Sequence, residues 1–134
     1  YIHAQYVSSK ETNFIGKQLE YVSPIILKTG VKIKHDRWGA TIQGSYNAAQ
    51  FSDASNSLEP SGDAVIGLVP EYFVMDLSAK YNCKKWITLE GGINNLLNES
   101  YFTRRATAYP GPGILPSDGR NFYVTVQWKI GERK

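Results

Sequence analysis

The stretch from Ile25 to Lys34, IILKTGVKIK, decides the fold class of this chain. Apolar and β-branched residues alternate along it with lysine and glycine, the two sets being Ile25, Leu27, Thr29, Val31 and Ile33, and Lys28, Gly30, Lys32 and Lys34. Successive side chains of a β-strand point to opposite faces of the sheet. The period of two therefore predicts a strand with one apolar face and one polar face.

The same alternation occurs in four further segments and, more weakly, near the start of the sequence. The four run from Trp38 to Asn47, Phe73 to Lys80, Ile87 to Asn94 and Phe122 to Ile130, and the weaker one covers Ile2 to Tyr6. Nine Tyr, five Phe, three Trp and twelve Gly in 134 residues favour strands and turns over helices. We predict an all-β fold, a single-domain antiparallel up-and-down meander of about six strands.

The connections between these predicted strands alternate between short and long. Tight polar turns are expected near residues 34–37 and 82–85, whereas residues 9–23, 52–70 and 98–119 form long connections. In an antiparallel meander every second connection lies at the same end of the sheet, so the long loops share one end and the tight turns share the other. Outer-membrane barrels have this asymmetry, with short periplasmic turns and longer extracellular loops.

Aromatic residues gather near both ends of the predicted strands. All three tryptophans adjoin the tight-turn end, and a second aromatic set lies near the long loops: Trp38, Trp86 and Trp128, and Tyr21, Phe51, Phe73 and Phe122. Two aromatic girdles are typical of a membrane barrel, although aromatic residues also flank turns in soluble β proteins. Trp86 is the exception, because its position in the alternation places it with the polar face.

Charge and cysteine content argue against several other classes. The net charge of +3 is mild and its cations are spread along the chain, which gives nucleic-acid binding little support. Cys83 is the only cysteine, so no internal disulfide forms, and no Cys/His spacing suggests a metal site. No apolar stretch approaches the ~20 residues of a membrane-spanning helix. The sequence starts in mid-strand without a signal-peptide pattern, so we expect a piece of a longer protein.

Three segments carry a resemblance to a known family. Residues 92–102, GINNLLNESYF, resemble the penultimate-strand motif of TonB-dependent receptors, in which an apolar strand end is followed by Asn-Asn-Leu and an aromatic pair. Residues 103–113 and 117–123 are similar to the last extracellular loop and closing strand of the ferric dicitrate receptor branch. Residues 19–24, LEYVSP, are similar to the Leu-Pro-Tyr-Val-Pro entry of a strand in this family, with Glu20 in place of the usual proline.

This resemblance implies a fold, a location and a function. Residues 1–134 would be the C-terminal part of a twenty-two-stranded transmembrane β-barrel in the outer membrane of a Gram-negative bacterium. Such receptors import a ferric chelate, here one like ferric citrate, with energy that the TonB complex transmits through a plug domain absent from this sequence. Lipid and lipopolysaccharide would be further partners, with no cofactor, no nucleic acid and no enzymatic activity.

The same resemblance implies candidate site residues in the last long connection. Arg104 and Arg105, with Tyr109, are candidates for binding an anionic ferric chelate, because the planar guanidinium can donate two parallel hydrogen bonds to a carboxylate. Pairing of these arginines with lipopolysaccharide phosphate or with loop carboxylates is an equal alternative. A further set of residues is assigned to turns and structural motifs: Asn94, Asn95, Asp118, Gly119 and Arg120. No catalytic residue and no metal-binding residue is expected.

Two other features have ordinary interpretations. The oxygen-rich loop from Asp53 to Asp63 lacks the closing acidic residue of an EF-hand and is interpreted as a polar surface loop. The lysine row in the first clear strand, Lys28, Lys32 and Lys34, could bind an anion, but a solvated lumen wall is the ordinary explanation for such a row. A soluble or small-barrel ligand-binding module remains the rival class. An outer-membrane enzyme would need a catalytic histidine, and neither His3 nor His35 has a matching partner.

Overall fold

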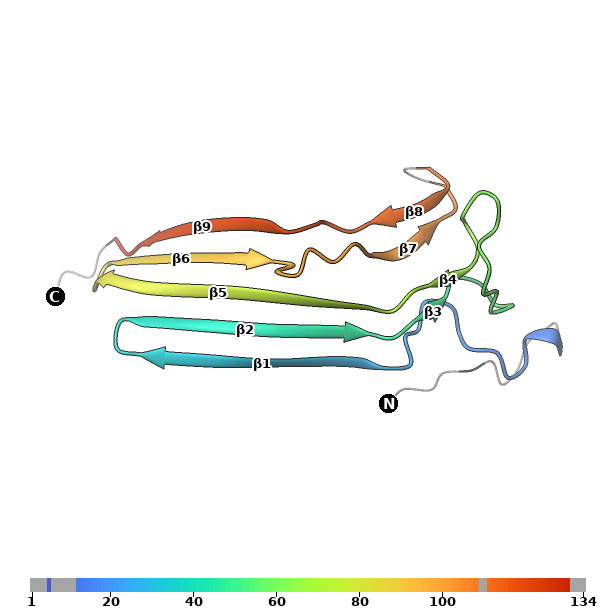
Figure 1. The fold of residues 1–134 in the computed structure, drawn as a ribbon, viewed down its shortest axis with the longest axis horizontal. Coiled ribbons are helices and arrows are strands. Elements are labelled where there is room, and N and C mark those ends of the chain that lie inside the picture. The colour runs from blue at the N-terminus through green and yellow to red at the C-terminus, as the bar shows by residue number, and fades with distance from the viewer. Residues whose placement is uncertain (1–4, 6–11, 109–110, 131–134) are drawn as a thin grey trace. The chain divides into compact units, whose positions relative to one another are not determined.

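The computed structural model describes Gln5, residues 12–108 and residues 111–130. Five long strands form one sheet (Figure 1) in the order β1-β2-β5-β6-β9: β1 (Ile26–His35), β2 (Trp38–Asn47), β5 (Tyr72–Lys84), β6 (Ile87–Asn94) and β9 (Asn121–Trp128). Neighbouring strands run in opposite directions, so the all-β antiparallel meander predicted from sequence is confirmed. The weaker strand predicted at the start lies outside the described residues except for Gln5, which forms an isolated antiparallel bridge with Gln18.

The chain divides into two compact units. The sheet unit consists of Lys28–Ser45, Val74–Glu99 and the residues from Asp118 onward, and it contains most of the five long strands. The loop unit consists of the residues up to Leu27, Tyr46–Phe73 and Ser100–Ser117, and it contains the long connections.

The register of β5, β6 and β9 separates apolar from polar side chains as the sequence predicted. Directly opposed residues share a face, and one face carries Leu77 opposite Ile93, Tyr81 opposite Leu89, Leu89 opposite Val126, and Ile93 opposite Phe122. The other face carries Lys80 opposite Glu90, Asn82 opposite Thr88, Thr88 opposite Gln127, and Asn94 opposite Asn121. The alternation therefore distinguishes two real faces of the sheet.

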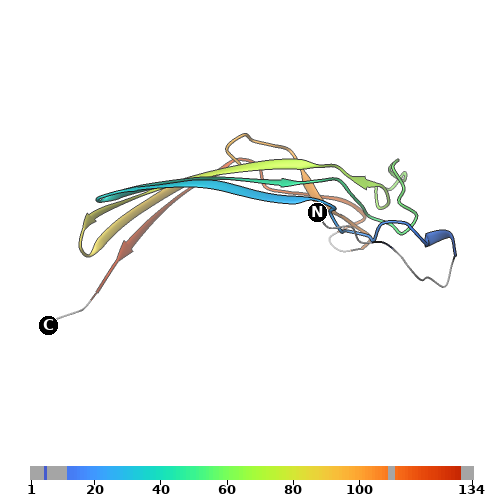
Figure 2. The same ribbon diagram turned by 90° about the horizontal axis from the view of Figure 1, so that it is seen from below.

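The apolar face of the sheet unit is uncovered within the described chain. Phe122 is 71% exposed, Val124 81% and Val126 62%, and Val31 and Ile33 of β1 are also exposed. Seen from the side, the strands form a single layer (Figure 2). An open sheet with one apolar face normally buries that face against another layer. Here the large apolar side chains have no such layer, so the sheet unit lacks a closed hydrophobic core.

The two tight turns lie at the same end of the sheet unit, as predicted, but both are shorter than the sequence suggested. Asp36 and Arg37 alone connect β1 to β2, and Lys85 and Trp86 alone connect β5 to β6. Because Trp86 is in a turn, the alternation of a strand does not fix its direction. Its ring lies 5.1 Å from that of Trp128, which shares the apolar face with Val126.

The long connections contain short hairpins that the sequence did not predict. One pairs β3 (Gln50–Phe51) with β4 (Leu68–Val69), and the other pairs β7 (Phe102–Ala106) with β8 (Gly113–Pro116). A three-residue 3-10 helix, η1 (Thr12–Phe14), is the only helix in the described part of the chain. None of the described residues forms a helix long and apolar enough to cross a membrane.

Candidate functional site

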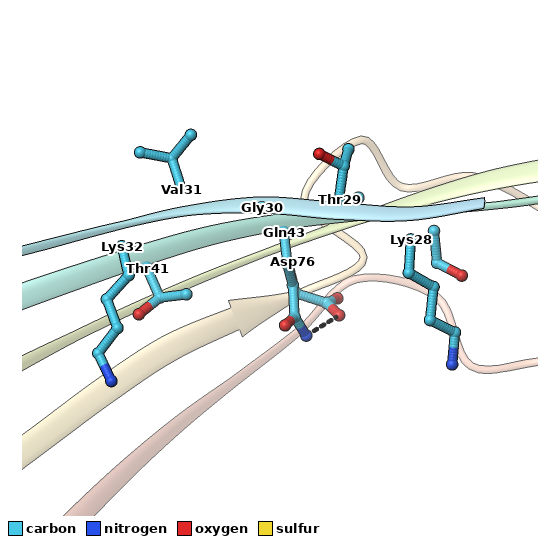
Figure 3. Close-up of a pocket in the computed structure, with 10 residues that line it drawn as sticks. Lys28, Thr29, Gly30, Val31, Lys32, Thr41, Gln43 and Asp76 are labelled. Carbon is cyan, nitrogen blue, oxygen red and sulfur yellow. Dashed lines mark hydrogen bonds between the residues drawn. The ribbon is translucent and has the colours of Figure 1, made fainter.

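The polar face of β1, β2 and β5 forms a shallow hollow of about 550 Å³. Lys28 and Lys32 of β1 point to this side together with Thr41 and Gln43 of β2 and Asp76 of β5, whereas Thr29 and Val31 point to the opposite side (Figure 3). The side-chain amide of Gln43 donates a hydrogen bond of 3.3 Å to Asp76 Oδ2. This arrangement places hydrophilic groups along a wall that water can reach.

Cations outnumber carboxylates on this face. Lys28, Lys32 and Lys34 line it from β1 and Lys80 from β5, while Asp76 and Glu90 supply the carboxylates in the hollows they share. The register sets Lys80 of β5 directly opposite Glu90 of β6. The Asp76 carboxylate accepts hydrogen bonds from the side-chain amide of Gln43 and, at 2.9 Å, from the backbone N–H of Asn95.

In the loop unit, Arg105 is 7% exposed and joins two long connections. Its Nη1 donates to the carbonyl oxygen of Ala64 at 2.7 Å and its Nη2 to that of Leu68 at 2.8 Å. The guanidinium also lies 5.2 Å from the ring centre of Phe102. The backbone carbonyl of Arg105 accepts a 2.9 Å hydrogen bond from the hydroxyl of Tyr21. The two terminal nitrogens of the side chain are thus occupied within the protein, an arrangement that the sequence alone did not suggest.

Arg104 lies differently, although it is the adjacent residue. It is exposed, and its guanidinium carbon stands 5.8 Å from the ring centre of Tyr21. Adjacent residues of a strand point to opposite faces, and the β7–β8 register pairs Arg104 with Leu115 and Arg105 with Ile114. Of the two candidate arginines, Arg104 is therefore the one that solvent can reach. The third candidate, Tyr109, lies outside the described residues.

Asn94 is the last residue of β6, and Asn95 begins the turn that follows. Asn95 is 3% exposed with φ of +50°, in the left-handed region that asparagine tolerates better than most residues. Its side-chain amide donates to the carbonyls of Glu99 and Asp118, and its Oδ1 accepts the backbone N–H of Glu99 at 2.8 Å. Asn94 instead bonds across the sheet to Asn121 at 2.8 Å. The Asn95 contacts tie the turn after β6 to the residues just before β9.

The segment Asp118-Gly119-Arg120 leads directly into β9. The carbonyl of Asp118 accepts from Asn95, and the backbone N–H of Arg120 donates to Asn98 Oδ1 at 3.0 Å. A Cβ on Gly119 would lie 3.3 Å from that same oxygen, a close approach that disfavours a larger residue there. The Arg120 side chain is exposed. The backbone of this segment, rather than its charges, fixes the entry to the closing strand.

The oxygen-rich loop from Asp53 to Asp63 uses its oxygens internally. The Asp53 carboxylate accepts from the backbone N–H and the hydroxyl of Ser57. Hydrogen bonds from the Ser61 hydroxyl and from the Val65 backbone N–H lower the pKa of the exposed Asp63 carboxyl. No group of three or more His, Cys, Asp and Glu among the described residues has metal-binding geometry. These contacts agree with the interpretation as a polar surface loop.

The loop unit also contains a buried hydrogen bond and a stacked pair of rings that the sequence did not predict. The hydroxyl of Ser23 is buried and donates to the carbonyl of Ala48 at 2.8 Å. The rings of Tyr72 and Tyr101 stack with centroids 4.5 Å apart. Both pairs join segments far apart in the sequence. The abundance of serine and tyrosine in the long connections was the only signal available, and it does not identify partners.

No family model matches the sequence. Among solved structures, the chain is similar to the unliganded ferric citrate transporter FecA, with a TM-score of 0.81 and 20% identity over 88% of this chain and 18% of FecA. It is also similar to the siderophore receptor PiuA from Acinetobacter baumannii, with a TM-score of 0.70 and 24% identity over 86% of this chain and 15% of PiuA.

A third similar structure is the ferripyoverdine receptor of the outer membrane of Pseudomonas aeruginosa, with a TM-score of 0.56 and 17% identity over 92% of this chain and 15% of that receptor. The chain thus spans less than a fifth of the length of each of these proteins. FecA is a transporter, and the other two are receptors. The chain shares the antiparallel β fold of one section of these three proteins.

Proposed function

We propose that this chain is the C-terminal part of the barrel of a TonB-dependent outer-membrane receptor that binds and imports a ferric chelate. The observation that carries the proposal is the single-layer sheet with an uncovered apolar face and a hydrophilic face. In a membrane barrel the outer face meets lipid and the inner face borders a polar interior. Fold similarity to a ferric citrate transporter and to a siderophore receptor supports the same assignment.

The rival, a soluble or small-barrel ligand-binding module, fits the exposures less well. Such a module would turn its apolar face inward, around a ligand or a dry core. In the described chain Val124 and Val126 are among the most exposed residues. Contact with lipid would remove this apolar surface from water without a second protein layer. The membrane interpretation therefore accounts for the exposed valines, and the soluble one leaves them unexplained.

On the ligand side, we propose Arg104 as a contact for an anionic chelate such as ferric citrate. Arg104 is exposed, and no carboxylate among the described residues lies within ion-pair distance of it. Its fork can bind a carboxylate through two hydrogen bonds. We also propose Tyr109, which lies between β7 and β8 in the sequence, as a contact for the chelate. Arg105, occupied by two carbonyls, would position the hairpin instead of touching the chelate.

The same proposal assigns the energy source of transport and the partners of the complete receptor. The hydrophilic hollow beside Lys28 and Lys32 would form part of the lumen wall, facing the plug of the complete receptor. The TonB complex would act on that plug, which is outside this sequence. The long connections would face the cell exterior and lipopolysaccharide, because barrels of this class place long loops outside and short turns in the periplasm.

Uptake by cells tests the proposed function. A strain that makes the complete receptor as its only ferric citrate receptor should accumulate radiolabelled iron from ferric citrate, and should lose uptake when TonB is deleted. The receptor should fractionate with the outer membrane and need detergent for extraction. Extraction of the protein in buffer without detergent would contradict the membrane assignment.

Ligand binding tests the role of Arg104. The Arg104→Ala receptor should bind ferric citrate about tenfold more weakly, because a charge-assisted bidentate contact is lost. Arg104→Lys should recover part of the affinity, since it restores the charge without the planar fork. Arg120→Ala, which removes an exposed cation elsewhere, serves as the control. Binding by Arg104→Ala equal to that of the unaltered receptor would remove Arg104 from the site.

A further inference from the structure

A bulge near the end of β5 changes the face on which Lys84 lies. Lys80 and Asn82 belong to the polar face, and an uninterrupted period of two would place Lys84 there as well. The register shifts between Asn82 and Lys84, so that Lys84 pairs with Ile87 on the apolar face. Bulges of this kind redirect side chains at the rims of barrels. The strand thereby places a cation on its otherwise apolar side.

Lys84 lies beside a pair of tryptophans on that side. Its Nζ stands 5.0 Å from the ring centre of Trp86, whose ring lies 5.1 Å from that of Trp128. A lysine at the edge of an apolar surface can extend its ammonium group toward water while its methylene groups stay on that surface. Tryptophan prefers the boundary between hydrocarbon and lipid headgroups. The three side chains together suit the headgroup level of a membrane.

Two more cations surround the hollow beside Lys84. This hollow, of about 630 Å³, is lined by Arg37 from the neighbouring turn and by Asn82, Cys83, Lys84 and Lys85. The backbone N–H of Asn82 donates to the carbonyl of Arg37 at 2.7 Å, which holds the two turn regions together. No carboxylate among the described residues lines the hollow, and Asp36, next to Arg37 in sequence, lies 3.4 Å from His35. Within the described part of the chain, the hollow therefore presents three positive charges without a neutralising partner in its lining.

We propose that Arg37, Lys84 and Lys85 bind the phosphate of an anionic phospholipid, whose acyl chains lie along the apolar face beside Trp86 and Trp128. This proposal rests on the proposed function, since it requires the apolar face to meet lipid. A phosphate group satisfies the cations, and acyl chains cover the apolar surface next to them. An inorganic phosphate ion would satisfy only the first of these features. Basic pockets at the membrane surface recognise anionic headgroups in this way.

Native mass spectrometry of the complete receptor tests this site. The detergent-solubilised receptor should retain added phosphatidylglycerol in preference to phosphatidylcholine, and excess inorganic phosphate should not displace it. The combined variant Lys84→Gln and Lys85→Gln should retain phosphatidylglycerol about 25-fold more weakly, because each cation near an anionic lipid contributes about fivefold to binding. Arg37→Gln lies outside β5, so it tests the site independently of the bulge, with an expected loss of about fivefold.

A variant with the same loss of charge provides the matched control. Lys17→Gln with Arg120→Gln removes two exposed cations from other parts of the chain and should keep the lipid preference. Equal weakening in this control, unchanged retention in the site variants, or displacement by inorganic phosphate would each overturn the proposal. Ferric citrate uptake, measured on the same variants, separates the two proposals. Normal uptake with no lipid preference overturns only the lipid site, and retained lipid with no uptake overturns only the transport proposal.

Discussion

The loop unit buries side chains, whereas the sheet unit exposes them. Val69 and Ala106, the two buried apolar residues of the described chain, both belong to the loop unit, as do the buried Ser23 and Arg105. In the sheet unit only the polar Asn95 among the described non-glycine residues is similarly buried, and large apolar side chains stay exposed along β9. The long connections are thus folded structures with their own packing, while the regular strands lack a core.

This difference shows what each unit needs from its surroundings. A single-layer sheet gains stability on its apolar face only from something outside it, which in our proposal is lipid. The loop unit instead stabilises itself through hydrogen bonds between distant segments, mostly to backbone carbonyls. Substitutions in the two units should therefore respond to different tests.

Arg105→Ala should have the largest effect. It removes two charge-assisted hydrogen bonds and leaves the carbonyls of Ala64 and Leu68 without these donors. We expect the loop unit to lose about 4 kcal/mol of stability, seen as faster cleavage of the loops by a non-specific protease. Arg104→Ala, at an exposed position, should leave the cleavage rate nearly unchanged. Equal sensitivity of the two variants would end the distinction between the buried and the exposed arginine.

A charged substitution on β9 tests the two faces of the sheet unit. Val124→Arg should destabilise the membrane-embedded receptor by about 3 kcal/mol, because a cation would replace a lipid-facing side chain. Thr125→Arg, on the opposite face across from Glu90, should cost little. Unfolding in lipid vesicles with increasing guanidinium measures both changes. If the two substitutions have equal effects, the apolar face does not meet lipid.

Asn95→Ala should cost about 2 kcal/mol, less than either change above. It removes the side-chain hydrogen bonds to Glu99 and Asp118 and places an alanine at positive φ. Asn95→Gly tolerates the backbone conformation but lacks the hydrogen bonds, so it should be intermediate. Asn94→Ala, which loses one exposed side-chain contact, is the control. Thermal unfolding of the receptor in detergent measures the series, and no difference between Asn94 and Asn95 would argue against the structural role.

The smallest effect should come from Asp63. Its folded pKa lies below the ordinary value of 3.8, so its ionised form stabilises the folded loop. This contribution is fully present above the ordinary pKa and disappears as the pH falls through the lowered one. Loop cleavage by an acid-active protease should therefore rise for the unaltered receptor below about pH 4, relative to its rate at higher pH. Asp63→Asn should remove this pH-dependent part of the cleavage rate. A pH profile of cleavage that is the same for Asp63→Asn and the unaltered receptor would contradict the prediction.

Much of the fold could be predicted from local patterns. The alternation from Ile25 to Lys34 and from Phe122 to Ile130 identified β1 and β9 to within a few residues. The two short connections lie at the same end of the sheet, as the sequence predicted. The small hairpins were missed because two to five residues show too little periodicity to predict a strand. The different positions of Arg104 and Arg105 were also missed, since the sequence shows two adjacent arginines and nothing of the carbonyls near them.

By itself, the sequence determined which side chains share a face of the sheet, because the period of two is a property of the backbone of each strand. Tertiary structure decided what depends on distant residues. Arg105 is buried through carbonyls 41 and 37 residues away, at Ala64 and Leu68. Lys84 lies on the apolar face because the hairpin with β6 places a bulge at the end of β5, which the alternation alone does not show. The partners of Arg105 are so far away that they leave no pattern in a local stretch of sequence, so only the folded chain brings them together.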